Sequence, residues 1–130
     1  GGKTAPSKEL EAFPNHSPGR HYLVTLSTEE FTCICPKTGQ PDFARISVFY
    51  VPDHKIIESK SFKLYLWSYR DEGIFHEHLV NRILDDIINV LDPHWCHVRG
   101  EFNIRGGIGI TVEADHARTE EARLAWKDRI

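Results

Sequence analysis

The most regular pattern in the sequence is a run of apolar residues that recurs at helical spacing between residues 75 and 91. They follow one another at intervals of four, one, three, one, three, one and three positions, which gives a helix one wide apolar face. Asp92-Pro93 comes next and ends the helix. The pattern predicts a helix from about Ile74 to Leu91. Its apolar positions are Phe75, Leu79, Val80, Ile83, Leu84, Ile87, Ile88 and Leu91.

Alternating apolar residues predict strands on both sides of this helix. We expect strands over residues 21–26, 43–51, 55–61, 95–104 and 108–112, a loop or frayed strand end over 31–41, and the start of a helix within 63–70. Turn residues at 52–54 and 105–107 predict two hairpins. Strands at both ends and helices between them indicate an α+β fold, an antiparallel sheet covered on one face by helices. Open sheet edges of this kind are often closed by assembly with other subunits.

The length of 130 residues suits one domain. We expect a flexible N-terminal arm over residues 1–19, because this segment is rich in Pro, Ser, Lys and Glu. The folded domain then spans 20–116, and a tail over 117–130 is helical or mobile. Hydrophobic residues make up 40% of the chain and charged residues 27%, as in ordinary globular proteins.

Charge and cysteine content limit the classes of binding partner and the cellular compartment that we expect. A net charge of -3 gives no long-range attraction to nucleic acid, and no apolar run is long enough to cross a membrane. Three cysteines (Cys33, Cys35 and Cys96) with no charged-then-apolar leader argue for reduced thiols. We therefore expect a cytoplasmic protein that binds neither nucleic acid nor a membrane.

The segment from Cys35 to Phe43 combines a thiol with nearby ionisable groups. Lys37 is a cation that can lower the pKa of the Cys35 thiol. Asp42 stands where the loop re-enters a strand, and a partly desolvated carboxyl group there can donate a proton. Such a pair suits attack on an electrophilic carbon. On spacing alone, however, the structural interpretation is the stronger one: a small buried cysteine and an aspartate that forms a turn.

Two further segments carry polar groups that could bind a ligand. Lys60 and Lys63, with hydroxyls between them, can bind phosphate, although an exposed strand end would have the same composition. No Gly-rich fingerprint of a Rossmann site accompanies them. His76 and Glu77 could act as an acid or base and as an anchor for a guanine-like edge. Acidic residues at a helix start also occur for electrostatic reasons alone.

Three pairs of potential metal ligands occur in the sequence, each with one residue between its members. They are Cys33 with Cys35, His76 with His78, and His94 with Cys96. Structural zinc sites usually have two to four residues between the members of a ligand pair, so these pairs, with one residue between, make no recognised site. We predict no bound metal.

Taken together, four segments resemble the NADPH-dependent 7-cyano-7-deazaguanine reductases, in that family's order and spacing. They are Cys35–Phe43, Glu58–Tyr65, Phe75–Glu77 and, more weakly, Arg105–Ile108. The resemblance covers about residues 13–113, in the short, single-module form of the family. It implies a tunnelling fold, in which an antiparallel sheet carries two antiparallel helices on one face. It also implies homo-oligomeric rings with active sites between subunits.

The resemblance also implies a reaction and a role for each matching residue. A nitrile on a small deazapurine is reduced to an amine by NADPH, on the path to queuosine in tRNA. Cys35 would form a covalent thioimide, with Asp42 and His76 as proton donors. The substrate would be bound by Ile57, Glu58, Ser59, His76 and Glu77, and the cofactor by Ser59, Lys60, Ser61, Lys63 and Arg105.

Two alternatives remain beside this hypothesis. One is a metal-dependent cyclohydrolase or pterin-type enzyme on the same fold, with histidine and cysteine ligands. The other is a pterin or purine carrier without turnover, which would bind its ligand and leave NADPH unoxidised.

Overall fold

The amphipathic segment that ends at Leu91 forms the longest helix of the structure, a computed structural model that describes residues 4–130. Along the chain the elements are β1 (Ala12–Pro14), β2 (Val24–Ile34), β3 (Pro41–Val51), β4 (Lys55–Ile57), α1 (Ser59–Trp67), α2 (His76–Leu91), β5 (Trp95–Arg105), β6 (Ile108–Ala117), α3 (Glu120–Trp126) and the short 3-10 helix η1 (Lys127–Arg129). Helix α2 ends at Asp92, whose left-handed backbone caps it ahead of Pro93.

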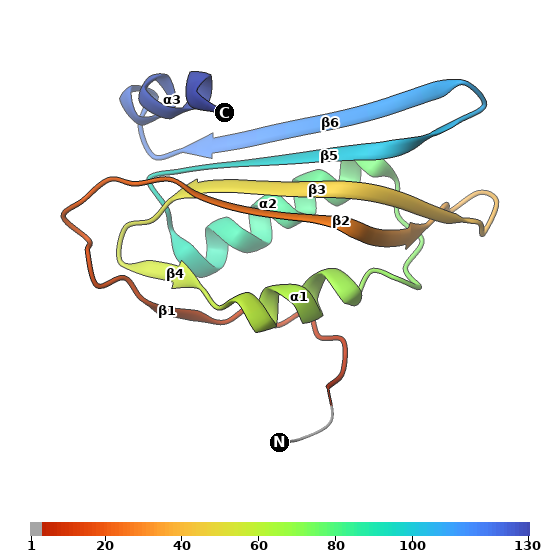
Figure 1. Ribbon diagram of the computed structural model, residues 1–130, viewed down its shortest axis with the longest axis horizontal. Coiled ribbons are helices and arrows are strands. Elements are labelled where there is room, and N and C mark those ends of the chain that lie inside the picture. The colour runs from red at the N-terminus through yellow and green to blue at the C-terminus, as the bar shows by residue number, and fades with distance from the viewer. Residues whose placement is uncertain (1–3) are drawn as a thin grey trace.

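A four-stranded antiparallel sheet in the order β2-β3-β5-β6 forms one layer of the molecule. Helices α1 and α2 run antiparallel to each other on one face of this sheet (Figure 1). The α+β class and the two antiparallel helices on one face are therefore confirmed. Among residues 4–130, no helix is long and apolar enough to cross a membrane.

The second hairpin forms as predicted, and the first does not. Strands β5 and β6 pair antiparallel through a turn at Gly106 and Gly107, both with positive φ. Strand β4, however, pairs with β1 in a separate two-stranded sheet. The predicted hairpin between 43–51 and 55–61 is thus wrong, because the chain turns away after Pro52 and enters α1 at Ser59.

The predictions for the loop and for the N-terminal arm need correction as well. Strand β2 continues to Ile34, so only the second part of the predicted 31–41 loop is a turn. Within the predicted arm, residues 1–3 lie outside the described residues. Residues 12–14 form β1, and Asn15 is buried because its side chain bonds to the Asp53 carbonyl and to the Tyr22 hydroxyl. The tail forms α3, one of the two outcomes expected for it.

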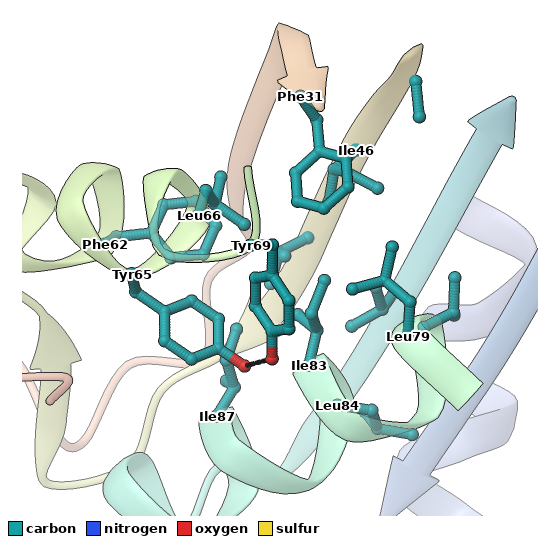
Figure 2. Packing of buried hydrophobic residues seen from close by; sticks show 14 of the residues in the cluster. Phe31, Ile46, Phe62, Tyr65, Leu66, Tyr69, Leu79, Ile83, Leu84 and Ile87 are labelled. Atoms are coloured by element: carbon teal, nitrogen blue, oxygen red, sulfur yellow. Dashed lines mark hydrogen bonds between the residues drawn. The ribbon is translucent and has the colours of Figure 1, made fainter. Parts of the chain in front are cut away.

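The main core lies between the sheet and the two helices. Strand β3 contributes Ala44, Ile46, Val48 and Tyr50, which alternate with residues of the outer face. Helix α2 contributes its apolar face, and Figure 2 shows Leu79, Ile83, Leu84 and Ile87 in this cluster. A smaller cluster of Val51, Trp95 and Trp126 attaches α3 at the end of the sheet where β5 begins.

A buried polar contact joins the two helices within this core. The Tyr65 hydroxyl of α1 donates to the Asp86 carboxylate of α2 and lies 2.8 Å from the Tyr69 hydroxyl (Figure 2). Burial raises the pKa of Tyr69 to about 12 and raises that of Tyr65 as well. Both phenols therefore stay protonated and able to donate hydrogen bonds at physiological pH, which keeps the two helices in register.

Candidate active site

Cys35 lies at the tip of β2, where the chain turns back toward β3. The Cys35 amide donates to the Gln40 carbonyl, and the Gly39 amide donates to the Cys35 carbonyl, both over 2.9 Å. Gly39 has φ of +71°, a backbone conformation that favours glycine and lets the turn close tightly. The turn holds the Cys35 side chain partly exposed at the end of the core.

The turn also makes Cys35 the most acidic thiol of the chain. Its pKa is lowered from the ordinary value, first by a hydrogen bond from the Thr38 hydroxyl and then by the amides of Thr38 and Lys37. Lys37 thus contributes its amide rather than the ammonium charge invoked from the sequence. Burial instead raises the pKa of Cys33 and of Cys96 to about 12. Cys35 is therefore the one thiol suited to act as a nucleophile near neutral pH.

Replacing Thr38 with valine should raise the pKa of Cys35 and slow its alkylation several-fold near neutral pH. The reason is that the hydroxyl is the largest cause of the lowered pKa, and valine keeps the shape but cannot donate. Iodoacetamide modification, followed by intact mass across a pH series, measures the effect. The matched control Thr25→Val, at an exposed position of β2, should leave the pH profile unchanged. An unchanged profile in Thr38→Val would contradict this role of the hydroxyl.

Asp42 is the polar end of the inward-facing stripe of β3. It is 6% exposed and pairs across the strands with Cys33, two residues before Cys35, so all three side chains belong to the inner face. Its Oδ2 lies 3.2 Å from His76 Nε2. Its charge acts on both thiols, because it is among the causes that raise their pKa values. Cys35, Asp42 and His76 therefore meet at one end of the core.

His76 is held in place by an aromatic contact as well as by Asp42. It is the first residue of α2, and its ring stacks on Phe102 of β5, with centroids 3.7 Å apart and planes at 10°. Phe102 itself is buried and stands next to Ala44 across the strands. The contacts with Phe102 and with Asp42 together hold the imidazole in place.

Arg105, predicted to bind the cofactor, also reaches Asp42. It ends β5, and its Nη1 lies 3.2 Å from Asp42 Oδ1 while its Nη2 donates to the Pro41 carbonyl. The arginine side chain is 43% exposed, whereas that of Asp42 is 7% exposed. In Figure 1 the β2–β3 turn, the start of α2 and the β5–β6 hairpin all lie toward the same end of the molecule. We call Cys35, Asp42, His76 and Arg105 the thiol cluster.

The segment between the helices joins α2 to the thiol cluster. The Ile34 amide donates to the Glu72 carbonyl, and the Ile74 amide donates to the Ile34 carbonyl. Glu72 in turn forms ion pairs with Lys8 (3.3 Å) and Arg82 (3.0 Å). These bonds fix the start of α2 beside the tip of β2, which places His76 within reach of Asp42.

Glu77, the predicted substrate anchor, stands in the first turn of α2 and is exposed. Within residues 4–130 its carboxylate has no hydrogen bond or ion pair, and its backbone carbonyl accepts from Asn81. A carboxylate in this state is available to an external donor. Its neighbour His76 is already engaged with Asp42.

The predicted substrate and cofactor residues 57–63 lie elsewhere, around the start of α1. Ile57 is buried, and its amide donates to the Tyr50 hydroxyl. The Glu58 carboxylate caps α1 by accepting from the amides of Lys60 and Ser61, which lowers its pKa. The Ser61 hydroxyl is engaged with the Glu58 carbonyl and the Glu11 amide. Glu58 and Ser61 therefore already have partners within the chain.

Ser59 and Lys63 instead face a groove of about 550 Å³ between α1 and β2. The groove is lined by five apolar and eight polar or charged residues: Thr4, Leu26, Ser27, Thr28, Glu30, Phe31, Thr32, Ser59, Phe62, Lys63, Leu66, Trp67 and Arg70. Lys60 is exposed beside it. The groove reaches Thr32, three residues before Cys35, but it does not include the thiol cluster.

The two groups of predicted residues are thus separated within one chain. The nine residues of α1 span about 13 Å at ~1.5 Å per residue, and the thiol cluster lies beyond the end of α1 opposite to Ser59. The structure brings together four of the predicted residues: Cys35, Asp42, His76 and Arg105. It places the predicted substrate residues Ile57, Glu58 and Ser59 away from them.

The three potential metal-ligand pairs do not converge. Cys33 and Cys96 are fully buried on different strands, and His94 lies at the start of β5, away from the thiol cluster. Among residues 4–130, no group of three or more histidine, cysteine, aspartate or glutamate side chains is arranged to hold a metal ion.

Two residues that shape the site were not identified from the sequence. Thr38 was part of the Cys35 segment, but a hydrogen bond to sulfur depends on the turn conformation, which the sequence pattern does not give. Phe102 carried no signal beyond its place in a strand, because its contact with His76 joins β5 to α2.

Comparison with known proteins gives consistent matches over most of the chain. Residues 41–121 match the family of QueF-like proteins. A relative from Syntrophus aciditrophicus, named NADPH-dependent 7-cyano-7-deazaguanine reductase, is 58% identical over 118 residues, which is 91% of this chain and 84% of the relative. A relative of the same name from Thermomicrobium roseum is 56% identical over 94% of this chain and 97% of its own length.

A solved structure supports the fold. The apo form of the archaeosine synthase QueF-Like matches with a TM-score of 0.69 and 27% sequence identity. The match covers 75% of this chain and 95% of that structure.

Proposed function

The chain belongs to the family of QueF-like proteins, and on that premise we propose that it is an NADPH-dependent 7-cyano-7-deazaguanine reductase. It would convert the nitrile of 7-cyano-7-deazaguanine to the primary amine of 7-aminomethyl-7-deazaguanine, on the path to queuosine in tRNA. The observation that carries the proposal is Cys35, a partly exposed thiol of lowered pKa, next to a buried carboxyl group. A nitrile carbon is a weak electrophile, and a thiolate is the side chain suited to attack it.

The first step in this proposal joins Cys35 to the substrate. Asp42 takes the proton from Cys35 Sγ, the thiolate bonds to the nitrile carbon, and Asp42 returns the proton to the nitrile nitrogen. The product is a neutral thioimide, so no proton is gained or lost overall. The position of Asp42 on the same inner face as Cys35 supports this role, and its contact with His76 gives it a route to a second proton.

The remaining steps replace the sulfur bond by hydrogen. NADPH, when bound, would supply the hydride, and reduction of a nitrile to an amine needs two such equivalents. After the first, the C–S bond breaks and Cys35 leaves as a thiolate, which is favourable because the turn stabilises its charge. His76 can then pass a proton to the nitrogen through Asp42 Oδ2, 3.2 Å away. The stack of His76 on Phe102 keeps the imidazole in line for this transfer.

The chain has a suitable surface for the cofactor in the groove between α1 and β2. Its lining includes the cations Lys63 and Arg70 and the hydroxyl of Ser59, a combination that suits phosphate groups beside apolar surface. Lys60 can add charge from the rim. Ser61 fits less well than the resemblance implied, since its hydroxyl is engaged inside the chain. We therefore assign the cofactor to Ser59, Lys60 and Lys63.

The separation of the predicted substrate residues supports an active site shared between subunits. Ile57, Glu58 and Ser59 lie a helix length away from Cys35 in the same chain, yet the resemblance assigns both to one substrate. A homo-oligomer would satisfy both assignments if the α1 start of one subunit met the thiol cluster of another. Within residues 4–130, β2 and β6 are the edge strands of the sheet, with β2 bridged on its outer side at Ile34, and these edges offer the surfaces for such an assembly.

The decisive test is the stoichiometry of NADPH oxidation with purified protein and 7-cyano-7-deazaguanine. We expect two NADPH oxidised per nitrile and a product that has gained four hydrogen atoms by mass spectrometry. 7-Deazaguanine without the nitrile serves as the control and should oxidise no NADPH. Product formation without NADPH oxidation, or activity that disappears with a chelator, would contradict the proposal. The second outcome would revive the metal-dependent cyclohydrolase, which the family membership does not favour.

A further inference from the structure

Arg105 has a contact that its predicted role in cofactor binding does not explain. Its guanidinium forms an ion pair with Asp42 Oδ1 at 3.2 Å and also donates to the carbonyl of Pro41, the residue before Asp42. Two bonds to adjacent points of one strand fix a planar guanidinium firmly. Arg105 thus attaches the β5–β6 hairpin to the start of β3, at the carboxyl group whose charge acts on Cys35.

Asp42 is enclosed by a small set of ionisable groups. His76 from α2 faces Oδ2, Arg105 from β5 faces Oδ1, and Cys33 and Cys35 from β2 and its turn lie on the same face of the sheet. Only Arg105 among these carries a charge that is fixed at all relevant pH values. The orientation of the carboxyl group therefore depends on one permanent ion pair and one contact with His76.

We propose that Arg105 is a positioning residue that holds the Asp42 carboxyl group in the orientation needed to move a proton between Cys35 Sγ and the nitrile nitrogen. This inference rests on the proposed function, and it gives Arg105 a task before NADPH enters the reaction. Arg105 itself exchanges no proton. The proton leaves the thiol, resides on Asp42, and reaches the nitrogen as the S–C bond forms.

This assignment predicts where in the reaction an Arg105→Gln variant fails. Formation of the covalent adduct with 7-cyano-7-deazaguanine, measured by intact mass without NADPH, should slow about 10- to 100-fold, because a misplaced proton carrier loses that much. The KM for NADPH should stay within about twofold of the wild type, since uniform binding is untouched. Alkylation of Cys35 by iodoacetamide needs no proton carrier at a nitrile and should proceed as in the wild type.

A double-mutant comparison separates positioning from other effects. If Arg105 acts through Asp42, adding Arg105→Gln to Asp42→Asn should not slow adduct formation further, because the two changes remove the same function. Arg105→Lys should recover part of the rate, since it keeps the charge but loses one of the two bonds. Arg45→Gln is the matched control: it changes an exposed arginine of β3 that faces the other side of the sheet, and it should react normally.

These measurements distinguish a positioning role of Arg105 from a role in cofactor binding alone. Normal adduct formation with a raised KM for NADPH would overturn the inference and make Arg105 a cofactor ligand only. Additive slowing in the double variant would overturn it as well, because Arg105 would then act independently of Asp42. If the wild-type protein forms no adduct at all, the proposed function fails, and this role of Arg105 fails with it.

Discussion

Replacing Cys35 with alanine is expected to abolish the covalent adduct with 7-cyano-7-deazaguanine and to lower turnover by at least about 10³-fold. No other thiol can take its place, because Cys33 and Cys96 are fully buried and their pKa values are raised to about 12. Intact mass after incubation with the nitrile measures the adduct, and NADPH oxidation measures turnover. The structural change should be small, since Cys35 lies partly exposed in a turn.

Cys96→Ala provides the matched control for this experiment. It removes a thiol from the interior of β5, far from the turn that carries Cys35, and should leave adduct formation intact. An adduct that persists in Cys35→Ala, or one that disappears in Cys96→Ala, would show that the nucleophile has been assigned to the wrong sulfur.

The largest effect on stability is expected for Ile83→Ala. Ile83 is 0% exposed in the middle of α2, and Figure 2 shows it pointing into the cluster between the helices and the sheet. Loss of its buried methyl and methylene groups, together with the cavity that they leave, should lower the free energy of unfolding by about 2–5 kcal/mol. Domains of this kind have only about 5–15 kcal/mol of stability, so the variant loses a large share.

Urea unfolding followed by circular dichroism measures this change, with the midpoint lowered and the dependence on urea concentration unaltered. Asp85→Ala, at an exposed position of the same helix, should change the free energy of unfolding by no more than about 0.5 kcal/mol. A loss of less than about 1 kcal/mol in Ile83→Ala would mean that α2 does not pack on the sheet as described.

The parts of the fold that the sequence predicted well are those with a long, regular pattern. Helix α2 repeats its apolar positions over four turns, and the β5–β6 hairpin combines alternation with two adjacent glycines at its turn. Strands β1 and β4 have three residues each, too few for a period to be visible, and their pairing joins segments more than forty residues apart. The start of α1 was missed because Glu58 is its cap, whereas shorter polar side chains are the usual signal.

In the candidate site too, the sequence predicted the proximity of some residues and not of others. Cys35 and Asp42 lie seven positions apart on two strands joined by one turn, so sequence proximity already predicted their proximity in space. The approach of His76 and Arg105 depends on how α2 and β5 pack against β3, which no local pattern encodes. The resemblance to a family supplied roles for these residues, and the structure adds the contact between Arg105 and Asp42.

The central strand pair has a consequence for how the chain folds. Strands β3 and β5 are neighbours in the sheet, with Val51 opposite Trp95, yet residues 52–94 lie between them and contain both helices of the inner layer. Bringing the ends of so long a loop together costs about 3 kcal/mol more in chain entropy than closing a two-residue turn. We therefore expect the β2–β3 and β5–β6 hairpins to form before β3 pairs with β5, and the closure of the segment that contains α1 and α2 to limit the folding rate.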